Sequence, residues 1–437
     1  MLVKCFSKSI LTFVLSEMKT VTLFLLLGLV LGDQWAVLMA CGKGFYRYNH
    51  HADVSHTYQM LRRGGIPADH IITFLRGDPI FDERNPFTGE LFHKPGLDPP
   101  NVFQGVVADY WGESVTVENF IFALKGDERA GGKILRSNAD DNVLIFTVSM
   151  GAPYTIRFET GNDLHANLFV ETIQKMHDNM MYKNLVIFTE SGYAGSIMKN
   201  LPTDIHAYAF SATNDQMGSE WTHCVNCYVR NTYMDFCLAD LFSLRWIEYL
   251  DVPEQRDTTL DALYNYLATN ITVQPVLRYG DMSIKNMSMT EFIGNYTGWN
   301  MLTIPRPTEK SLTDYVRVQP IVMSSTCVQQ YSNDIRMQAL CTRAQSSTGA
   351  TKQKLQKELS DEVASRKAVD AYFKGLLTKP AYNIFPDGVI STTCYDRAMK
   401  QFTDRFGFSE YATRYYKIFI NICNENPNAF GGGSLRE

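Results

Sequence analysis

The sequence lacks an excess of charge, internal repeats and, after residue 31, any long apolar run. Its formal net charge is only −5 over 437 residues, with a pI near 6.0, which gives no reason to expect nucleic-acid binding. No later apolar run reaches the roughly 20 residues that a membrane-spanning helix needs. With 45% hydrophobic, 12% aromatic and 20% charged residues, the chain has the composition of an ordinary folded protein of one or two domains.

The N-terminus has the pattern of a secretory leader. Met18-Lys-Thr is a short basic start, and residues 21–31 form an apolar run. Val30 and Gly32 are small enough for cleavage by a signal peptidase. We therefore predict a leader over residues 1–32, with Met18 as the true start, and entry into the secretory pathway.

Sequons and cysteines agree with export. Three N-x-S/T sequons lie close together, at Asn270, Asn286 and Asn295, and predict N-glycosylation. Of the nine cysteines, Cys5 falls in the predicted leader. The other eight are an even number in a chain bound for an oxidising compartment.

One cysteine pair invites a metal interpretation. Cys224-Val-Asn-Cys227 has the spacing of half a zinc site, but the sequence has no second pair with that spacing. We predict no metal site, and interpret the pair as a disulfide or as free thiols. Cys41 and Cys237 are expected to be buried, apolar-like residues.

From residue 34 to about 300, short apolar runs alternate with helical stretches. Runs rich in Val, Ile and Phe predict buried strands at 35–41, 70–75, 142–148, 184–189 and 205–211. Helical spacing lies between them, at 53–63, 115–124 and 163–180. The alternation predicts an α/β fold, with a mostly parallel sheet flanked by helices. Ligands in such sheets lie at the carboxyl ends of strands, so a site is expected within 42–51, 149–153 and 190–195.

The rest of the chain predicts loops and helices. Residues 78–112 are turn-rich and predict a long surface loop, and residues 302–325 are a connector punctuated by Pro and Thr. Good helix formers dominate 333–378 and 392–424. The predicted organisation is a leader at 1–32, an α/β domain at 33–300, a connector at 301–345 and an all-α domain at 346–437.

Many short motifs recur in the order and at the spacing of one protein family. Gly44-Phe-Tyr-Arg-Tyr-Asn-His-His-Ala-Asp53 matches its first active-site loop, and Leu61-Arg-Arg-Gly-Gly-Ile-Pro67 matches the next helix and turn. Gly195-Ser-x-Met198 and Trp246-x-Glu248 follow in order. On these residues the chain resembles the legumain (asparaginyl endopeptidase) family, peptidase C13. The resemblance implies a caspase-like α/β fold followed by a death-domain-like helical prodomain, in a secreted or lysosomal/vacuolar protein.

The resemblance implies a cysteine peptidase, but its catalytic groups are missing. Such an enzyme needs a thiolate nucleophile, a histidine base and a group that orients the imidazole. The family's Cys falls on Gly192, its His on Met150 and its orienting Asn on Arg47. Loss of a whole triad costs roughly a million-fold in turnover. We therefore predict an inactive pseudoprotease with no intact catalytic residue.

Neighbouring side chains offer an alternative chemistry. Ser149, Ser191 and Tyr193 flank the vacated positions, and His50 lies on the first loop. A replacement nucleophile still needs a general base within hydrogen-bond reach.

The family's substrate pocket is half kept. Its acidic members map to Glu190 and Asp240, its His to His50, and its Arg to Asn49. The pocket is therefore more acidic, unless Arg47 reaches back into it, and our hypothesis is that it no longer prefers an Asn side chain. The alternative is that the two carboxylates are ordinary structural residues.

Two further patterns have plain interpretations. Cys394 and Cys423 match a family disulfide, worth about 3–4 kcal/mol in the chain-entropy model, and Cys327 with Cys341 is a candidate new bridge. Arg76-Gly-Asp78 spells an integrin-type tripeptide, which we interpret as a strand-exit turn.

Three functions remain open. The first is a secreted or lysosomal pseudoprotease that binds peptides, cystatin-like inhibitors or an active legumain. The second is an active asparaginyl endopeptidase with an unorthodox nucleophile. The third is a structural or antigenic secreted glycoprotein. None of the three requires a cofactor.

Overall fold

The computed structural model describes residues 32–158, 163–224, 227–234, 236–295, 326–327, 335–407 and 410–431. Contacts divide the chain into two units, Met1–Asp33 and Gln34–Glu437, and only the second is described below. The predicted leader up to residue 31 and the predicted connector at 302–325 lie outside the described residues. In the described part, no helix has the length and apolar character needed to cross a membrane.

The centre of the fold is a seven-stranded sheet in the order β14-β9-β8-β4-β1-β2-β3. Its strands are β1 (Gln34–Ala40), β2 (Ile71–Leu75), β3 (Tyr110–Trp111), β4 (Asn142–Val148), β8 (Asn184–Glu190), β9 (Ala207–Ser211) and β14 (Leu277–Gly280). The strands pair in parallel, except that β14 is antiparallel to β9. The five predicted strands and the mostly parallel sheet are confirmed. The edge strands β3 and β14 were not predicted, because they are short and do not form continuous buried runs.

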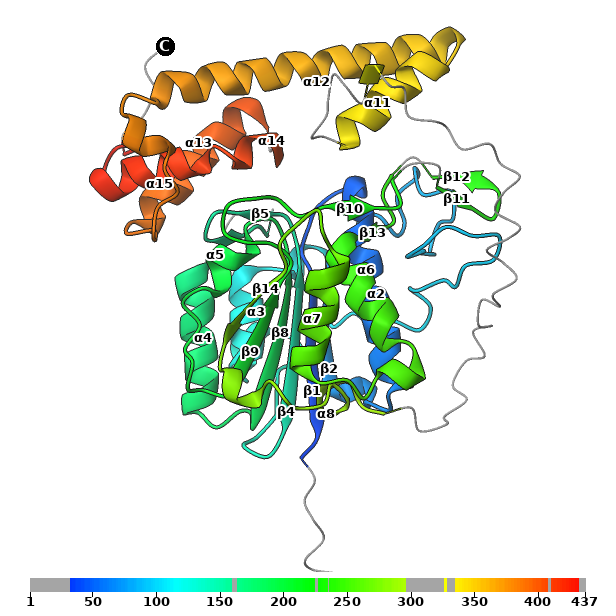
Figure 1. The fold of residues 1–437 in the computed structure, drawn as a ribbon, viewed down its shortest axis with the longest axis vertical. Helices are drawn as coiled ribbons and strands as arrows, with labels where there is room; N and C mark the ends of the chain where they lie inside the picture. Colours follow the sequence, from blue (N-terminus) through cyan, green and yellow to red (C-terminus); the bar gives the residue numbers. More distant parts are fainter. Residues whose placement is uncertain are drawn as a thin grey trace, which may run out of the picture. The chain divides into compact units, whose positions relative to one another are not determined.

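Helices cover both faces of this sheet (Figure 1). One face packs against α3 (Val117–Leu124), α4 (Ala166–Asp178) and α5 (Ala194–Met198), and the other against α2 (Tyr48–Arg63), α6 (Leu241–Leu250) and α7 (Leu260–Asn270). Alternate strand residues supply the two cores: Ile145 of β4 packs in the first, and Phe146 in the second. Helix α2 begins five residues before the predicted start, because its first turn is a buried polar segment without apolar periodicity.

Among the residues that the structure describes, seven short strands and one short helix lie outside the seven-stranded sheet. They are β5 (Gly151–Ala152), β6 (Thr155–Ile156), β7 (Leu164–His165), β10 (Trp221–Thr222), β11 (Tyr228–Val229), β12 (Thr232–Tyr233), β13 (Ala239–Asp240) and α8 (Thr290–Ile293). The predicted loop runs from residue 78 to β3. Arg76 is buried and pairs with Glu113 at 2.6 Å, so the Arg-Gly-Asp tripeptide is part of a structural strand exit.

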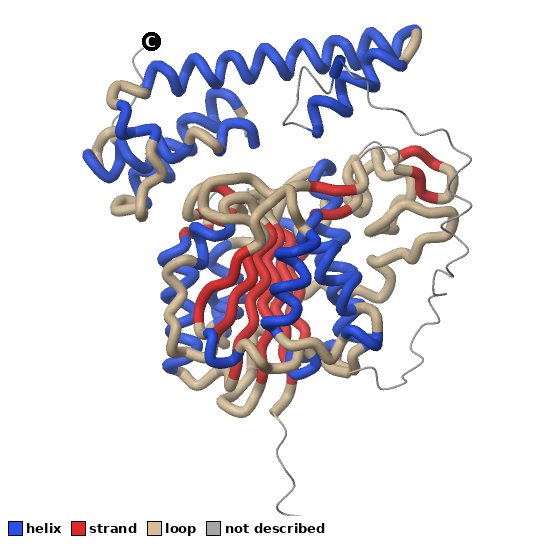
Figure 2. Tube along the Cα trace, in the orientation of Figure 1, coloured by secondary structure: helices blue, strands red, loops and turns tan. Residues whose placement is uncertain are grey.

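The C-terminal region is all-helical, as predicted (Figure 2). Helices α11 (Ile335–Ser346) and α12 (Gly349–Leu376) fall within the first predicted stretch. The second stretch is split into α13 (Thr392–Phe406), α14 (Glu410–Thr413) and α15 (Tyr416–Glu425). The first break follows Gly407, which has a left-handed φ of 73° that favours glycine.

The C-terminal helices share a core with the sheet. Phe402 of α13 and Phe419 of α15 belong to the same buried cluster as Phe158, which follows β6. The Tyr395 hydroxyl donates to the Pro153 carbonyl at 3.2 Å, and His165 Nε2 lies 2.8 Å from Asp396. The helices therefore pack directly on the loops that follow β4.

Three disulfides link Cys394 to Cys423, Cys327 to Cys341, and Cys224 to Cys237. The first is the pair implied by the family resemblance, and the second is the candidate new bridge. Cys227 and Cys41 are buried and are not in disulfides. Two expectations were wrong: Cys224 does not pair with Cys227, and Cys237 is not an apolar-like free residue. The chain turns back at β11 and β12, which brings Cys237 rather than Cys227 to Cys224.

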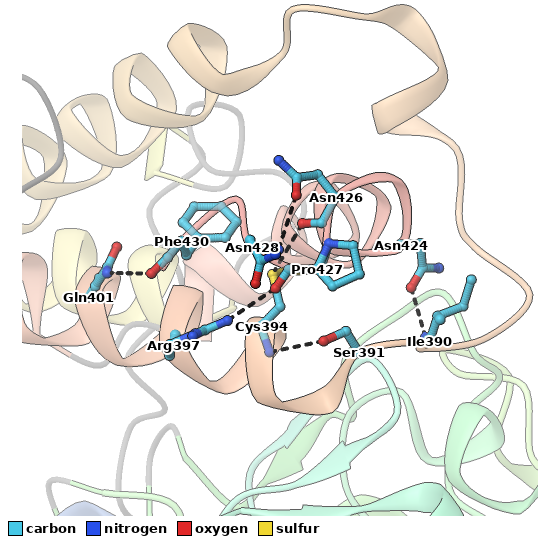
Figure 3. The surroundings of a disulfide bond; sticks show 11 residues. Ile390, Ser391, Cys394, Arg397, Gln401, Asn424, Asn426, Pro427, Asn428 and Phe430 are labelled. Atoms are coloured by element: carbon cyan, nitrogen blue, oxygen red, sulfur yellow. Dashed lines mark hydrogen bonds between the residues drawn. A yellow bond between two sulfur atoms is a disulfide. The ribbon is translucent and has the colours of Figure 1, made fainter. Parts of the chain in front are cut away.

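Hydrogen bonds around Cys394 hold the C-terminal segment against α13 (Figure 3). The backbone N–H of Cys394 donates to the N-cap hydroxyl of Ser391 at 3.3 Å. Arg397 donates to the Pro427 carbonyl, and Gln401 donates to the Phe430 carbonyl. The segment after α15 is thus fixed along a helix that itself contacts the loops of the sheet.

Candidate functional site

The predicted site segments meet at one end of the sheet. Ala40, Val148 and Glu190 lie in one row across β1, β4 and β8. The chain leaves all three strands at the same edge, and the Ser149 N–H donates to the Glu190 carbonyl at 3.1 Å. This edge is the expected location of a ligand in an α/β fold.

Met150 and Gly192, the two residues predicted to replace the catalytic His and Cys, lie side by side there. Met150 and Gly192 follow Val148 and Glu190 by two residues each, on neighbouring strands. The backbones are in close contact, because a Cβ built on Gly151 would lie 1.8 Å from the Gly192 carbonyl oxygen. Gly192 therefore offers no side chain there, and its neighbour Met150 is a buried thioether.

The flanking hydroxyl groups do not replace them. Ser149 donates its hydroxyl to the Arg157 carbonyl, and Thr413 of α14 donates to the Tyr193 hydroxyl at 3.4 Å. Ser191 Oγ is buried and has no hydrogen-bond partner in the part of the chain that the structure describes. Neither serine is bonded to an imidazole there, so the general base that a serine nucleophile needs is missing.

Arg47 is the N-cap residue of α2 and is half-buried. It is the residue predicted to replace the family's orienting Asn. Its carbonyl accepts from His51 Nδ1 at 2.8 Å, and His51 Nε2 accepts from the Gly77 N–H at 2.9 Å. The Arg47 side chain lies near His50, because a Cβ built on Gly42 would contact both side chains at about 2.8 Å. Arg47 therefore lies beside the candidate pocket.

The four predicted pocket residues come together from three elements. Asn49 of α2 donates from Nδ2 to Asp240 Oδ1 at 2.8 Å, and His50 Nε2 lies 3.8 Å from Asp240 Oδ2. Asn49, His50, Glu190 and Asp240 are each only 1% exposed. Burial lowers the pKa of His50, and the positive charge of Arg47 lowers it further, which favours a neutral imidazole.

Glu190 has a clear structural contact. Its Oε2 accepts from the Ser243 N–H at 3.0 Å and from the Ser243 hydroxyl at 2.9 Å. Ser243 lies in the first turn of α6, where backbone N–H groups lack partners within the helix and favour negative charge. Asp240 is the N-cap residue, but its side chain does not cap the helix. Glu190 therefore caps α6 from the neighbouring strand.

Two residues of this region were missed from the sequence. Asp53 Oδ1 accepts from His93 Nε2 at 2.5 Å and from the Asp240 N–H at 3.4 Å. Burial raises the pKa of Asp53 well above its ordinary value, and nearby Glu190 adds to the effect. Asp53 ends the matched first loop, which was a signal that it belongs to the site. His93 lies in the turn-rich loop, where no pattern marked it.

Three buried carboxylates, those of Asp53, Glu190 and Asp240, thus lie in the region of Met150 and Gly192. Burial raises the pKa of Glu190 well above its ordinary value, and the charge of Asp240 raises it further. Within the described ranges, no three His, Cys, Asp or Glu side chains are arranged to hold a metal ion. The arrangement brings together polar groups, while Met150 and Gly192 offer neither a nucleophile nor a general base.

The fold and the site define the class of the protein. It has the caspase-like scaffold of the peptidase C13 family, with the candidate site at the carboxyl ends of β4 and β8. The model of the Peptidase C13 family matches residues 34–295, and the chain belongs to that family.

Relatives match over most of the chain. It is 30% identical over 409 residues to a protein named legumain from Pongo abelii, covering 90% of each chain. It is 37% identical over 263 residues to a hemoglobinase of Schistosoma japonicum, covering 60% of each. It is 29% identical over 417 residues to the vacuolar-processing enzyme delta-isozyme of Arabidopsis thaliana, covering 90% of this chain and 87% of that protein.

Proposed function

We propose that this member of the C13 family is a pseudoprotease that binds a peptide or protein ligand without cleaving it. The observation that carries the proposal is that Met150 and Gly192, to which we assign the family's base and nucleophile, lie side by side after adjacent strands and offer neither group. Without a thiolate and an imidazole, covalent catalysis has no starting point. Candidate ligands are peptides, cystatin-like inhibitors and an active relative.

The retained pocket points to a ligand other than an Asn side chain. Asn49 stands where the family has an Arg, and it already donates to Asp240. The pocket has thus exchanged a cationic group for a neutral amide beside Asp240 and Glu190. An Asn side chain has an amide with an oxygen end and an NH2 end, which suit a positive and a negative group of the pocket. Replacement of the family's Arg by Asn49 removes the positive group.

Three features support the proposed secreted or lysosomal location. The side chains of Asn270, Asn286 and Asn295 are all exposed, as glycosylation of these residues requires. Three disulfides are what an oxidising compartment permits. A relative named as a vacuolar-processing enzyme fits the same route.

A second candidate function is a structural or antigenic glycoprotein with no pocket ligand. The specific observation in its favour is that Glu190 caps α6 through Ser243, which explains the carboxylate without any ligand. A third, an active enzyme with a serine nucleophile, requires Ser191 to acquire a base that the described residues do not give it.

A peptide-binding panel separates these functions. Purified protein is titrated with matched peptides that differ only in Asn, Asp, Lys or Ala at one position, while cleavage is followed by mass spectrometry. We expect binding without turnover and no selectivity for Asn. Asn49→Arg should raise selectivity for Asn, whereas Arg129→Ala, at an exposed ion pair far from the site, should change nothing.

Each other outcome has a meaning. Selective binding of the Asn peptide by the unmodified protein contradicts the proposed pocket. Turnover that stays with the protein through fractionation contradicts inactivity. Absence of binding to every peptide and to active legumain favours the structural alternative.

A further inference from the structure

A chain of hydrogen-bonded side chains runs from the buried carboxylates towards the surface. Asp53 Oδ1 is 2.5 Å from His93 Nε2, and His93 Nδ1 is 2.8 Å from His56 Nδ1. His56 Nε2 is 3.3 Å from Asp251 Oδ2. Exposure rises along the chain, from 0% at Asp53 and 2% at His93 to 12% at His56 and 28% at Asp251. The outer end is therefore accessible to solvent, and the inner end is sealed.

The fold builds this chain from three segments. Asp53 and His56 are one turn apart on α2, and Arg63 lies two turns further along the same helix face. His93 comes from the loop that packs on α2, and Asp251 is the C-cap residue of α6. Arg63 Nη2 donates to Asp251 Oδ1 at 2.6 Å, which fixes the outer carboxylate.

The hydrogen bond between His56 Nδ1 and His93 Nδ1 contains one proton, which is bound either to His56 or to His93. The four residues therefore have two possible arrangements of protons. In the first, Asp53 is ionised, His93 carries its proton on Nε2, and His56 is an imidazolium that donates to both His93 and Asp251. In the second, the His56 Nδ1 proton has moved to His93 Nδ1, and the His93 Nε2 proton has moved to Asp53. Both arrangements contain the same three protons, and every hydrogen bond of the chain is kept.

We propose that Asp53, His93, His56 and Asp251 form a proton relay, which sets the charge of the buried carboxylates from the solvent side. A proton taken up at His56 Nε2 reaches Asp53 by two short transfers, and no water has to enter the site. On rising pH the path runs backwards, and the proton leaves from His56.

The environment of each group favours delivery to the inner end. Burial lowers the pKa of His93 well below its ordinary value, so that ring stays neutral and passes the proton on. Burial raises the pKa of Asp53, which makes it the acceptor. Burial also works to raise the pKa of Asp251, but His56 and Arg63 outweigh it and hold that pKa well below its ordinary value. The outer carboxylate therefore stays ionised.

Other charged groups lie around the four relay residues and favour or disfavour a charge on them. His56, His223 and Lys94 disfavour a charge on His93, while Asp251 favours one. Glu248 and Arg245 act on His223, and Glu248 also pairs with Lys94 at 3.5 Å. At the inner end, Glu190 opposes ionisation of Asp53, while hydrogen bonds with Asp240 and Ser243 favour it.

The relay connects solvent pH to the candidate pocket. Asp53 Oδ1 accepts from the backbone N–H of Asp240, whose side chain holds Asn49. Protonation of Asp53 weakens that acceptor and removes the negative charge of this carboxylate beside Asp240. This inference rests on the hydrogen bonds alone, and it holds whether or not the proposed ligand binds.

The test is to follow the tautomer of His93 by 15N NMR of the imidazole nitrogens in the full chain between pH 8 and 4. The His93 signals are assigned by loss in His93→Gln. We expect the ring proton to move from Nε2 to Nδ1 on acidification. Asp251→Asn removes a negative charge, so the midpoint should fall, and Arg63→Gln removes a positive charge, so it should rise. Each shift should be roughly 0.5–1 pH unit, the scale of one partly exposed charge.

Asp251 and Arg63 both lie at the outer end of the relay. General structural damage would not shift the His93 midpoint in opposite directions in the two variants. Asp396→Asn is the matched control, because Asp396 pairs with His165 at 2.8 Å, outside the relay, and the variant should leave the His93 midpoint unchanged. The relay is overturned if the His93 tautomer does not change with pH. It is also overturned if both variants shift the His93 midpoint in the same direction, or if Asp251→Asn leaves that midpoint unchanged.

Discussion

Glu190 and Gly192 lie two residues apart, at the end of β8 and just after it, yet they differ in what the fold asks of them. Glu190 caps α6 through Ser243, so the carboxylate has a structural task besides any role in binding. Gly192 has no side chain, and Met150 beside it has a buried thioether side chain. The comparison teaches that a residue predicted for the pocket, Glu190, is also part of the structure of α6, whereas Gly192, predicted to replace the nucleophile, contributes no side chain to the packing.

The largest effect on stability should come from removing the cap. Glu190→Ala leaves the Ser243 N–H and hydroxyl without their buried acceptor, and we expect a loss of about 2 kcal/mol. Urea denaturation measures it, with Glu128→Ala at an exposed ion pair as the control expected to change stability by less than about 0.5 kcal/mol. Equal effects of the two variants would remove the structural half of the comparison.

A smaller effect should appear in the pH dependence of stability. The folded pKa of Glu190 is raised, so its contribution is fully present below its unfolded pKa of about 4.3 and is lost as pH rises towards the folded value. Glu190→Gln lacks this loss. The stability of the variant relative to the unmodified protein should therefore increase as pH rises above about 4.

Chemical denaturation at a series of pH values measures this difference. His93, whose lowered pKa acts in the opposite direction, is present in both proteins and cancels. A stability difference that is constant from pH 4 to 8 would show that Glu190 is not buried as an acid.

The smallest effects on stability should come from substitutions at Met150 and Gly192. Met150→Leu conserves volume and should cost less than about 1.5 kcal/mol. Gly192→Ala places a Cβ 3.1 Å from the Gly218 Cα, a tight contact that a small loop shift relieves. Thermal unfolding of both variants checks this, and a loss as large as that of Glu190→Ala would mean that these positions are also structural.

The sequence predicts the parts of the fold that rest on continuous apolar runs. The buried strands β1, β4 and β8 were found because all or nearly all their residues are core residues. The start of α2 was missed because Asn49 and His50 are buried through polar contacts, which leave no periodic signal. The partner of Cys224 could not be found either, since pairing depends on how the chain turns back.

The candidate site was predicted as far as family motifs mark it. The pocket side chains meet as the resemblance implied, while their role in binding remains a prediction. The links from Asp53 to His93 and His56, and from Glu190 to Ser243, join residues far apart in sequence. Such contacts follow from tertiary packing and have no local signature.

The most direct test of the central claim is peptide cleavage by this protein beside the double variant Gly192→Cys with Met150→His. Both are assayed on an Asn-containing peptide, before and after limited proteolysis, because Tyr395 and Thr413 of the C-terminal helices contact the site loops. We predict no turnover by the unmodified protein and measurable cleavage by the double variant. Turnover by the unmodified protein that co-purifies with it, and that Ser191→Ala abolishes, would contradict the account.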